Sequence, residues 1–230
     1  MKRRTLLTIT SLLTAIASAP AWAQVAPSAS EASAYSGLHA AAHQGDAAKI
    51  ARLVAQGAAL NATDTRGRTP LHVATFARQR EAIRALVKAG ADINRLENDR
   101  YDAVTIASVA DDEETLKLLL QLGASAKQTT SRYDGTALIA AAHLGHDGVV
   151  RQLIAAGAPL DHVNNLHWTA TIESIVLGDG GARHQATLKA LIDAGAGLQL
   201  ADRAGQTPLA LARSRGHSAM VAMLEKAGAR

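Results

Sequence analysis

The chain has 230 residues, of which 48% are hydrophobic, 19% are charged and only 3% are aromatic, and it contains no cysteine. Without cysteine the protein has no disulfide, no cysteine nucleophile and no lipidated N-terminal cysteine. Residues 24–230 carry 21 basic and 20 acidic side chains, because three of the 24 basic residues precede position 24. This balance argues against a nucleic-acid partner, which would require a basic surface.

Residues 1–23 have the layout of a secretory signal peptide. Positions 2–4 are basic, positions 6–19 are mostly apolar, and Ala21-Trp22-Ala23 supplies small residues for cleavage. The apolar stretch is too short and too polar to span a membrane, and no later segment reaches the roughly 20 apolar residues needed. We expect cleavage after Ala23 and a periplasmic protein without membrane insertion. Arg3-Arg4 resembles a twin-arginine signal, but the very short basic region favours the Sec route.

Residues 24–34 are rich in alanine and serine and include Pro27. This composition predicts a flexible linker. The remainder, residues 35–230, is predicted to be one repeat domain without a second domain.

A hexapeptide, Thr69-Pro70-Leu71-His72-Val73-Ala74, sets the register of this domain. Threonine is a good helix N-cap and proline is well tolerated at the first helical position, so the motif predicts a helix start. Equivalent positions follow at steps of 33 to 38 residues, at Ser36, Thr69, Asp102, Thr136, Thr169 and Thr207. A second series in phase with the first marks helix ends, each glycine being followed by alanine, at Gly57, Gly90, Gly123, Gly157, Gly195 and Gly228.

The motif and its period resemble the ankyrin repeat, whose signature is T-P-L-H-x-A. The resemblance covers residues 35–230 and implies an all-α repeat solenoid of about six repeats, each with a β-turn finger and two antiparallel helices. The repeats start near residues 36, 69, 102, 136, 169 and 207. The signatures at Asp102 and Thr169 are weak, so the sequence does not predict whether repeats three and five are fully ordered. Repeat five has five extra residues within 178–183, between its helices.

The histidines do not form a convincing metal site. His39 and His72 hold the fourth position of the signature, where the resemblance implies that the imidazole ties one turn to the next. The pairs His39/His43 and His143/His146 have helical spacing but no third ligand nearby in sequence. No metal, no other cofactor and no catalytic motif is predicted, so the chain is not expected to be an enzyme.

The few aromatic residues fall at selected positions of the repeat. Tyr35, Tyr101 and Trp168 come one residue before the motif, Tyr133 comes three before it, and Phe76 lies on the first helix. The resemblance implies that such positions contact partners on the finger tips and the concave face, and aromatic side chains often anchor interfaces. The alternative is that each ring packs on the next finger. The predicted partner-binding residues are Arg66, Arg68, Phe76, Asn98, Asp99, Tyr101, Arg132, Tyr133, His143, Asn165, Trp168, Glu173 and Arg203.

The sequence thus predicts a monomeric, non-catalytic protein–protein interaction module. An adaptor or accessory factor for another exported protein, such as a stress-related one, is the first hypothesis. The second is an immunity or inhibitor protein that blocks a toxin or a hydrolase. Neither hypothesis identifies the partner, because a fold of this kind is compatible with many partners.

Overall fold

The computed structural model describes residues 24–230, so the predicted signal peptide and its cleavage after Ala23 lie outside the described residues. Within the described part there are thirteen helices and no strand, which confirms the all-α architecture. The helices are α1 (Ala29–Ala34), α2 (Gly37–Gln44), α3 (Ala47–Ala55), α4 (Pro70–Phe76), α5 (Arg80–Lys88), α6 (Ala103–Val109), α7 (Glu113–Gln121), α8 (Ala137–Leu144), α9 (Asp147–Ala155), α10 (Ala170–Val176), α11 (Ala182–Asp193), α12 (Pro208–Ser214) and α13 (Ser218–Lys226).

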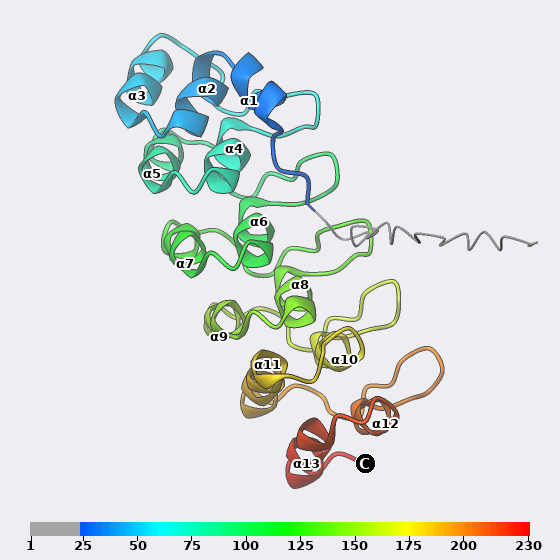
Figure 1. Ribbon diagram of the computed structural model, residues 1–230. Coiled ribbons are helices and arrows are strands. Elements are labelled where there is room, and N and C mark those ends of the chain that lie inside the picture. Colours follow the sequence, from blue (N-terminus) through cyan, green and yellow to red (C-terminus); the bar gives the residue numbers. More distant parts are fainter. Residues whose placement is uncertain (1–23) are drawn as a thin grey trace, which may run out of the picture.

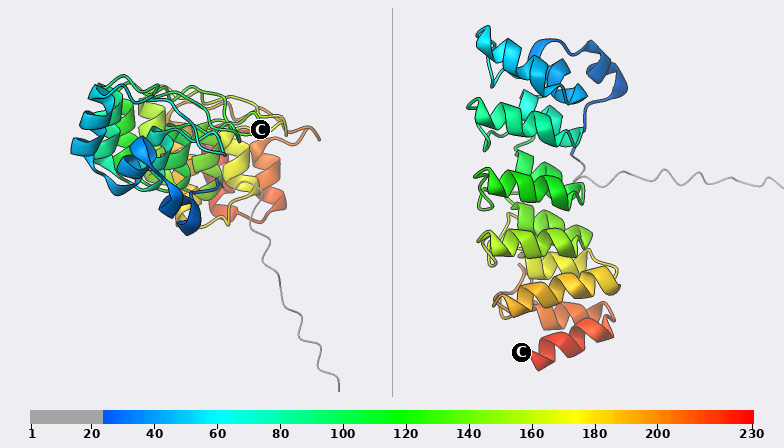
Figure 2. Two further views of the ribbon diagram at one scale, coloured as in Figure 1. Left: turned by 90° about the horizontal axis from the view of Figure 1, so that it is seen from above. Right: turned by 90° about the vertical axis from the view of Figure 1, so that its left-hand side faces the viewer.

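From α2 onward the helices form six antiparallel pairs that stack into a solenoid (Figure 1). In each pair an inner helix, from α2 to α12 in even numbers, precedes an outer helix, from α3 to α13 in odd numbers. Inner helices contact inner helices of the neighbouring pairs, and outer helices contact outer helices. The long loops between pairs all project to one side, as Figure 1 and the left view of Figure 2 show. We call these loops the fingers, and the surface shared by the fingers and the inner helices the concave face.

The repeated motif determines where each inner helix begins. In five of the six repeats the N-cap side chain accepts a hydrogen bond from the backbone N–H three residues later, as Asp102 does from Thr105 at 2.7 Å. Ser36 occupies the N-cap of α2 without such a bond. The six predicted starts therefore coincide with the observed N-caps, including the weak signatures at Asp102 and Thr169.

The signature histidines link neighbouring turns, as predicted. The Nδ1 atom of His72 accepts from the backbone N–H of Thr69 at 3.0 Å, and its Nε2 bonds the carbonyl of Arg95 at 3.0 Å. Burial lowers the pKa of His72, which favours the neutral ring. The Nε2 atom of His39 bonds the carbonyl of Arg68 at 2.9 Å in the same manner. Both residues have structural roles.

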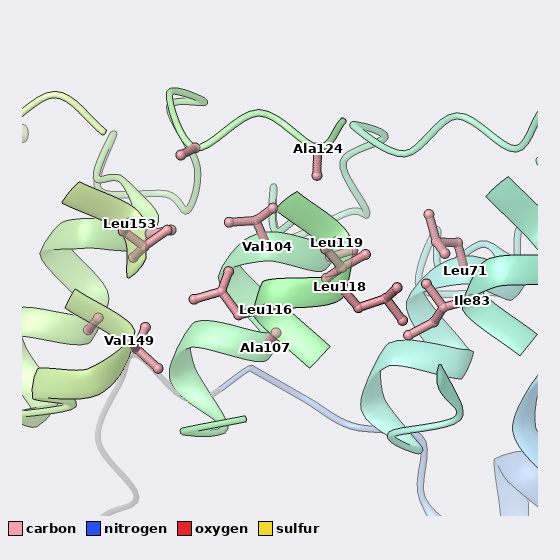
Figure 3. Packing of buried hydrophobic residues seen from close by; sticks show 14 of the residues in the cluster. Leu71, Ile83, Val104, Ala107, Leu116, Leu118, Leu119, Ala124, Val149 and Leu153 are labelled. Carbon is pink, nitrogen blue, oxygen red and sulfur yellow. The ribbon is translucent and has the colours of Figure 1, made fainter. Parts of the chain in front are cut away.

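The core lies between the two helix layers and is built from aliphatic side chains. Leu71 and Ile83 of repeat two lie beside Leu118 and Leu119 of repeat three, and the same cluster continues to Leu153 in repeat four (Figure 3). All five side chains are at most 2% exposed. Each repeat buries its apolar face only against its neighbours, so the array is stable as a stack and not as separate units.

The extra residues of repeat five are divided between a loop and a helix. The connection from α10 to α11 is longer than its counterpart between α4 and α5, and α11 has 12 residues where α5 has 9. The lengthened helix places Arg183 near two other repeats. Its guanidinium pairs with Asp111 of repeat three at 2.9 Å and with Asp147 of repeat four at 3.3 Å. The insertion thus adds an ion-paired bridge along the stack.

The segment expected to be a flexible linker, residues 24–34, differs from that expectation because it contains α1. Ser28 and Glu31 form a reciprocal capping box, in which each side chain accepts from the other residue's backbone N–H. The carbonyl of Val25 accepts from Arg68 at 3.2 Å, and α1 lies beside α2 at the N-terminal end (Figure 1). Capping and the tertiary bonds together order a segment whose composition alone favours disorder.

Candidate protein-binding surface

The fingers form a hydrogen-bonded ladder along the solenoid. The backbone N–H of Asn98 donates to the carbonyl of Arg66 at 3.0 Å, and its amide group donates to Thr65 at 3.3 Å. Asn165 repeats this arrangement two fingers further on, bonding the carbonyls of Tyr133 at 2.9 Å and Arg132 at 3.0 Å. Asn98 and Asn165 therefore hold neighbouring fingers together, and the fingers present a continuous surface.

The charged side chains predicted at the finger tips are exposed but paired with their neighbours. Arg132 lies 3.2 Å from Asp99 of the preceding finger, and its side chain is 66% exposed. Arg66 lies 3.4 Å from Glu31 of α1, and Arg203 donates to the carbonyl of Asn165 at 3.0 Å. Exposed ion pairs contribute little to stability, so these groups can exchange partners at low cost when another protein approaches.

Three of the predicted contact residues, Arg68, Glu173 and Tyr101, are buried. The side chain of Arg68 and the residue Glu173 are each only 1% exposed. A partner docking on the solvent-exposed surface cannot reach Arg68, because α1 and the first finger enclose it. Tyr101 is 9% exposed, so its ring mainly packs within the stack, as the alternative hypothesis for the aromatics states. Phe76 and Trp168 are half-buried, and Trp168 packs against the core of repeats five and six.

Arg68 is the centre of an ion-pair cluster at the N-terminal end. Its Nε atom lies 2.7 Å from Asp64, and its Nη2 atom lies 2.7 Å from Glu31. The hydroxyl of Tyr35 donates to the same Asp64 carboxylate at 2.7 Å. Burial acts to raise the pKa of Asp64, but the bonds from Tyr35 and Arg68 outweigh it and lower that pKa. The cluster fastens α1 to the first finger.

A partly open cavity of about 270 Å³ lies on the concave face between repeats three, four and five. Four of the predicted residues line it: Tyr101, Tyr133, His143 and Glu173. The other lining residues are Thr105, Val109, Thr130, Ser131, Gly135, Thr136, Ile139, Ala140, Leu144, His146 and Asn164. The cavity thus joins predicted residues that lie as far as 72 positions apart in the sequence.

The polar end of the cavity is organised around Glu173 of α10. One carboxyl oxygen accepts from the Asn164 amide at 2.8 Å, and the other lies 3.2 Å from Nδ1 of His143 on α8. The remaining walls are largely apolar, with Val109, Ile139 and Leu144 among them. A buried carboxyl group beside apolar walls is suited to a guest that is mostly apolar and carries one hydrogen-bond donor.

Sequence reasoning did not identify Gly135 and Asn164 as part of this site. Gly135 stands directly before Thr136, the N-cap of the inner helix of repeat four. The corresponding residues of other repeats are Arg68, Tyr101 and Trp168. That substitution of a large residue by glycine was visible in the sequence. Asn164 carried no such signal, because its role depends on a contact with a residue of the following helix.

Across residues 24–230 no group of three or more histidine and acidic side chains is placed to hold a metal ion. No helix in the same part of the chain has the length and apolar character needed to cross a bilayer.

Comparison with known proteins identifies the family. A family model described as ankyrin repeats in three copies matches residues 23–97 and 104–196, which is more than half of the chain. The chain belongs to the ankyrin repeat family. Ankyrin repeats are protein–protein interaction modules, and proteins built from them are generally non-catalytic.

Relatives and solved structures agree with this assignment. The ankyrin repeat protein YahD of Escherichia coli (strain K12) is 39% identical over 100 residues, which are 43% of this chain and 50% of YahD. An ankyrin repeat domain from Acinetobacter baumannii AYE is 42% identical, with a TM-score of 0.79 over 84% of this chain and 98% of the domain. The ankyrin repeat domain of Bcl-3, a member of the IκB family, is 25% identical, with a TM-score of 0.76 over 86% of this chain and 88% of the domain.

Proposed function

We propose that this ankyrin-repeat protein is an exported, non-catalytic adaptor that binds one partner protein on its concave face in the bacterial periplasm. The cavity between repeats three and five is the observation that carries the proposal. It gathers aromatic and polar side chains from three repeats next to exposed, exchangeable charges on the fingers. Buried anchors surrounded by a polar rim are typical of protein interfaces.

The ladder of finger hydrogen bonds supports the same function. A scaffold that is already ordered loses little conformational entropy when it binds. Export is supported by the basic, apolar and small-residue layout of residues 1–23. The protein is proposed to act as a monomer, for which size-exclusion chromatography with light scattering should give the mass of one chain.

Site-directed photo-crosslinking tests the proposed surface. A photoreactive amino acid replaces Arg132 or Arg203 on the fingers, and in matched controls it replaces Arg84 or Lys117, which are exposed on the outer helices α5 and α7. Irradiation of intact source cells should give one discrete adduct from the finger positions and none from the outer helices. Adducts from the outer helices alone would overturn the placement on the concave face, and adducts only with cytoplasmic proteins would overturn export.

The identity of the captured protein then separates the two functional hypotheses. An adaptor leaves the activity of its partner intact or raises it, whereas an inhibitor abolishes it when added in equimolar amount. The adaptor is proposed because the charged finger tips are paired within the protein, whereas a tight inhibitor would be expected to present them unpaired for strong electrostatic steering.

A further inference from the structure

The residues directly before the N-caps of the inner helices form a column along the concave face. In repeats one to three, and in repeat five, the column consists of large side chains: Tyr35, Arg68, Tyr101 and Trp168. Each of them fills space at the junction of a finger and an inner helix, either buried as Arg68 is or half-buried as Trp168 is. Repeat four has Gly135 in the same place, and the cavity lies beside it.

The backbone does not require glycine at this position. Gly135 does not adopt the left-handed conformation that favours glycine, unlike most other glycines of the chain. A Cβ atom placed there would meet the Ser131 hydroxyl at 3.6 Å and the Ile139 methyl at 3.8 Å, which are ordinary van der Waals distances. Ala140, also on the cavity wall, is a second small residue. The cavity therefore exists because side-chain volume is missing and not because the chain turns away.

The dimensions and lining of the cavity indicate what would fill it. Its volume of about 270 Å³ lies just below the range of about 300–1,000 Å³ that is usual for small-molecule pockets. One large side chain is a better match for this space than a cofactor-sized ligand. Tyr101 and Tyr133 offer aromatic surfaces, and aromatic pairs gain energy beyond the area that they bury.

The Glu173 carboxyl group adds a directional preference. Its oxygens engage Asn164 and His143, and a carboxylate has about four lone-pair sites, so acceptor capacity remains for a donor that enters the cavity. An aromatic ring with a donor group, an indole N–H or a phenol O–H, satisfies both the apolar walls and this acceptor.

We propose that the partner protein inserts one tryptophan or tyrosine side chain into this cavity, where it takes the place that Arg68, Tyr101 and Trp168 hold in the column. The inserted ring contacts Tyr101 and Tyr133 and donates a hydrogen bond to Glu173. This inference rests on the proposed protein-binding function and specifies the chemistry of the partner at one site.

Small-molecule probes test the cavity without knowledge of the partner. Indole and p-cresol represent the two side chains, toluene has the ring without the donor, and n-butylammonium represents a lysine. Titration of methyl-labelled protein followed by NMR should show saturable shifts of the Ala140 and Ile139 methyl groups with indole and p-cresol at millimolar concentration. Toluene should bind about fivefold more weakly, because it lacks one hydrogen bond. Tighter binding of n-butylammonium than of indole, or no saturable binding of either aromatic donor, would overturn the proposal.

A pair of substitutions at one position supplies the control. Gly135→Leu should fill the cavity and abolish indole binding, whereas Gly135→Ala should retain binding within about twofold, and circular dichroism should show that both variants are folded. If Gly135→Leu does not fold, Ala140→Leu fills the same space from α8. The photo-crosslinking assay then connects the cavity to the partner. Loss of the finger adduct in the cavity-filling variant but not in Gly135→Ala is the expected result.

A failure of this inference can be distinguished from a failure of the proposed function. A finger adduct that persists at full yield in the cavity-filling variant overturns this inference and leaves the proposed function standing. The absence of any adduct from either finger position in the protein that carries the photoreactive residue but no cavity-filling substitution overturns the proposed function. Since the inserted residue must come from a partner, that result also overturns this inference, whatever the probes show.

Discussion

Repeats two and four differ most clearly at the residue that precedes the N-cap of the inner helix. In repeat two this residue is Arg68, which is 1% exposed and is held by Asp64 and Glu31 at 2.7 Å each. In repeat four it is Gly135, and a cavity of about 270 Å³ occupies the corresponding region. The first region is completed by α1 of the same chain, and the second is open to another molecule. One position of the repeat can therefore serve stability in one copy and recognition in another.

The comparison also shows that a repeat motif does not determine the role of the residues beside it. The signature fixes the helix start and the core in both repeats, as the N-caps Thr69 and Thr136 show. The side chain at the position before the N-cap makes no capping bond to either helix, so the residue type there can vary. Its role is set by what lies across the concave face, which is α1 for Arg68 and the Glu173 carboxyl group for Gly135.

The largest loss of stability is expected when the buried side chain of Arg68 is removed. Arg68→Ala removes the guanidinium from a buried cluster, which leaves Asp64 without its ion-pair partner and Glu31 with only the exposed Arg66. Breaking a buried ion pair by removing one partner typically costs about 3–5 kcal/mol, so we expect the free energy of unfolding to fall by about 3 kcal/mol. Urea denaturation followed by far-ultraviolet circular dichroism measures this change.

Arg66→Ala is the matched control for this substitution. Arg66 also contacts Glu31, but its side chain is 44% exposed. Exposed pairs contribute about 0–1 kcal/mol, so the control should lose less than about 1 kcal/mol. Equal losses in the two variants would show that the burial of Arg68 is not what stabilises the N-terminal end.

Removal of the Tyr101 ring, which holds the equivalent position in repeat three, should cause the next largest loss of stability. Tyr101→Ala removes a ring that is 9% exposed and extends the cavity towards repeat three. Truncation of a buried aromatic residue costs about 3–5 kcal/mol in well-packed cores, and the existing cavity already reduces the packing here, so we expect about 2–3 kcal/mol. Chemical denaturation of Tyr101→Ala and of Tyr133→Ala, whose ring is more exposed, provides the comparison. A smaller loss for Tyr101→Ala than for Tyr133→Ala would contradict the assigned packing role.

How far the sequence predicts these two regions depends on the range of the interactions. The six helix starts were predictable because the N-cap position and the apolar spacing are local and repeated. The helix α1 was missed, although Ser28-x-x-Glu31 is a capping-box pattern, because a serine-rich composition suggested disorder. The bond from Arg68 to Glu31 spans 37 residues and had no repeat equivalent, so no periodic signal announced it.

The candidate site shows the same division. Tyr101, Tyr133, His143 and Glu173 were predicted from their positions in the repeat, and the structure places all four on one cavity. The burial of Arg68 and Glu173 was not predicted, because polar residues are normally exposed and these two are buried only through partners in other elements. The cavity itself follows from an absent side chain at Gly135, which only a comparison between repeats reveals.

A smaller effect is expected from the bridge that repeat five forms over repeat four. Arg183→Ala removes the pairs with Asp111 and Asp147, and the Arg183 side chain is 53% exposed. Solvent screens such pairs, so the free energy of unfolding should fall by no more than about 1 kcal/mol. The difference between Arg183→Ala and the unmodified protein should also shrink in 1 M salt, where the Debye length is about 3 Å. A loss that is independent of salt would show that Arg183 acts through packing of its aliphatic stem.

The smallest effect is confined to the helix α1, whose stability depends on pH through the ionisation of Glu31. Bonds from the backbone N–H and the hydroxyl of Ser28, and then from Arg68, lower the pKa of Glu31 from 4.5 to about 2. Because the folded pKa is depressed, this group stabilises α1 fully above pH 4.5 and loses that contribution as the pH falls towards 2. The NMR amide signals of Ser28 and Glu31 should therefore shift to random-coil positions in this window, before the core amides of Leu71 do. In Glu31→Gln the ionisation is absent, so α1 should be frayed at neutral pH and its signals should no longer respond to acid with a midpoint near 2. An unchanged midpoint in that variant would mean that another carboxylate, Asp64 first of all, controls the docking of α1.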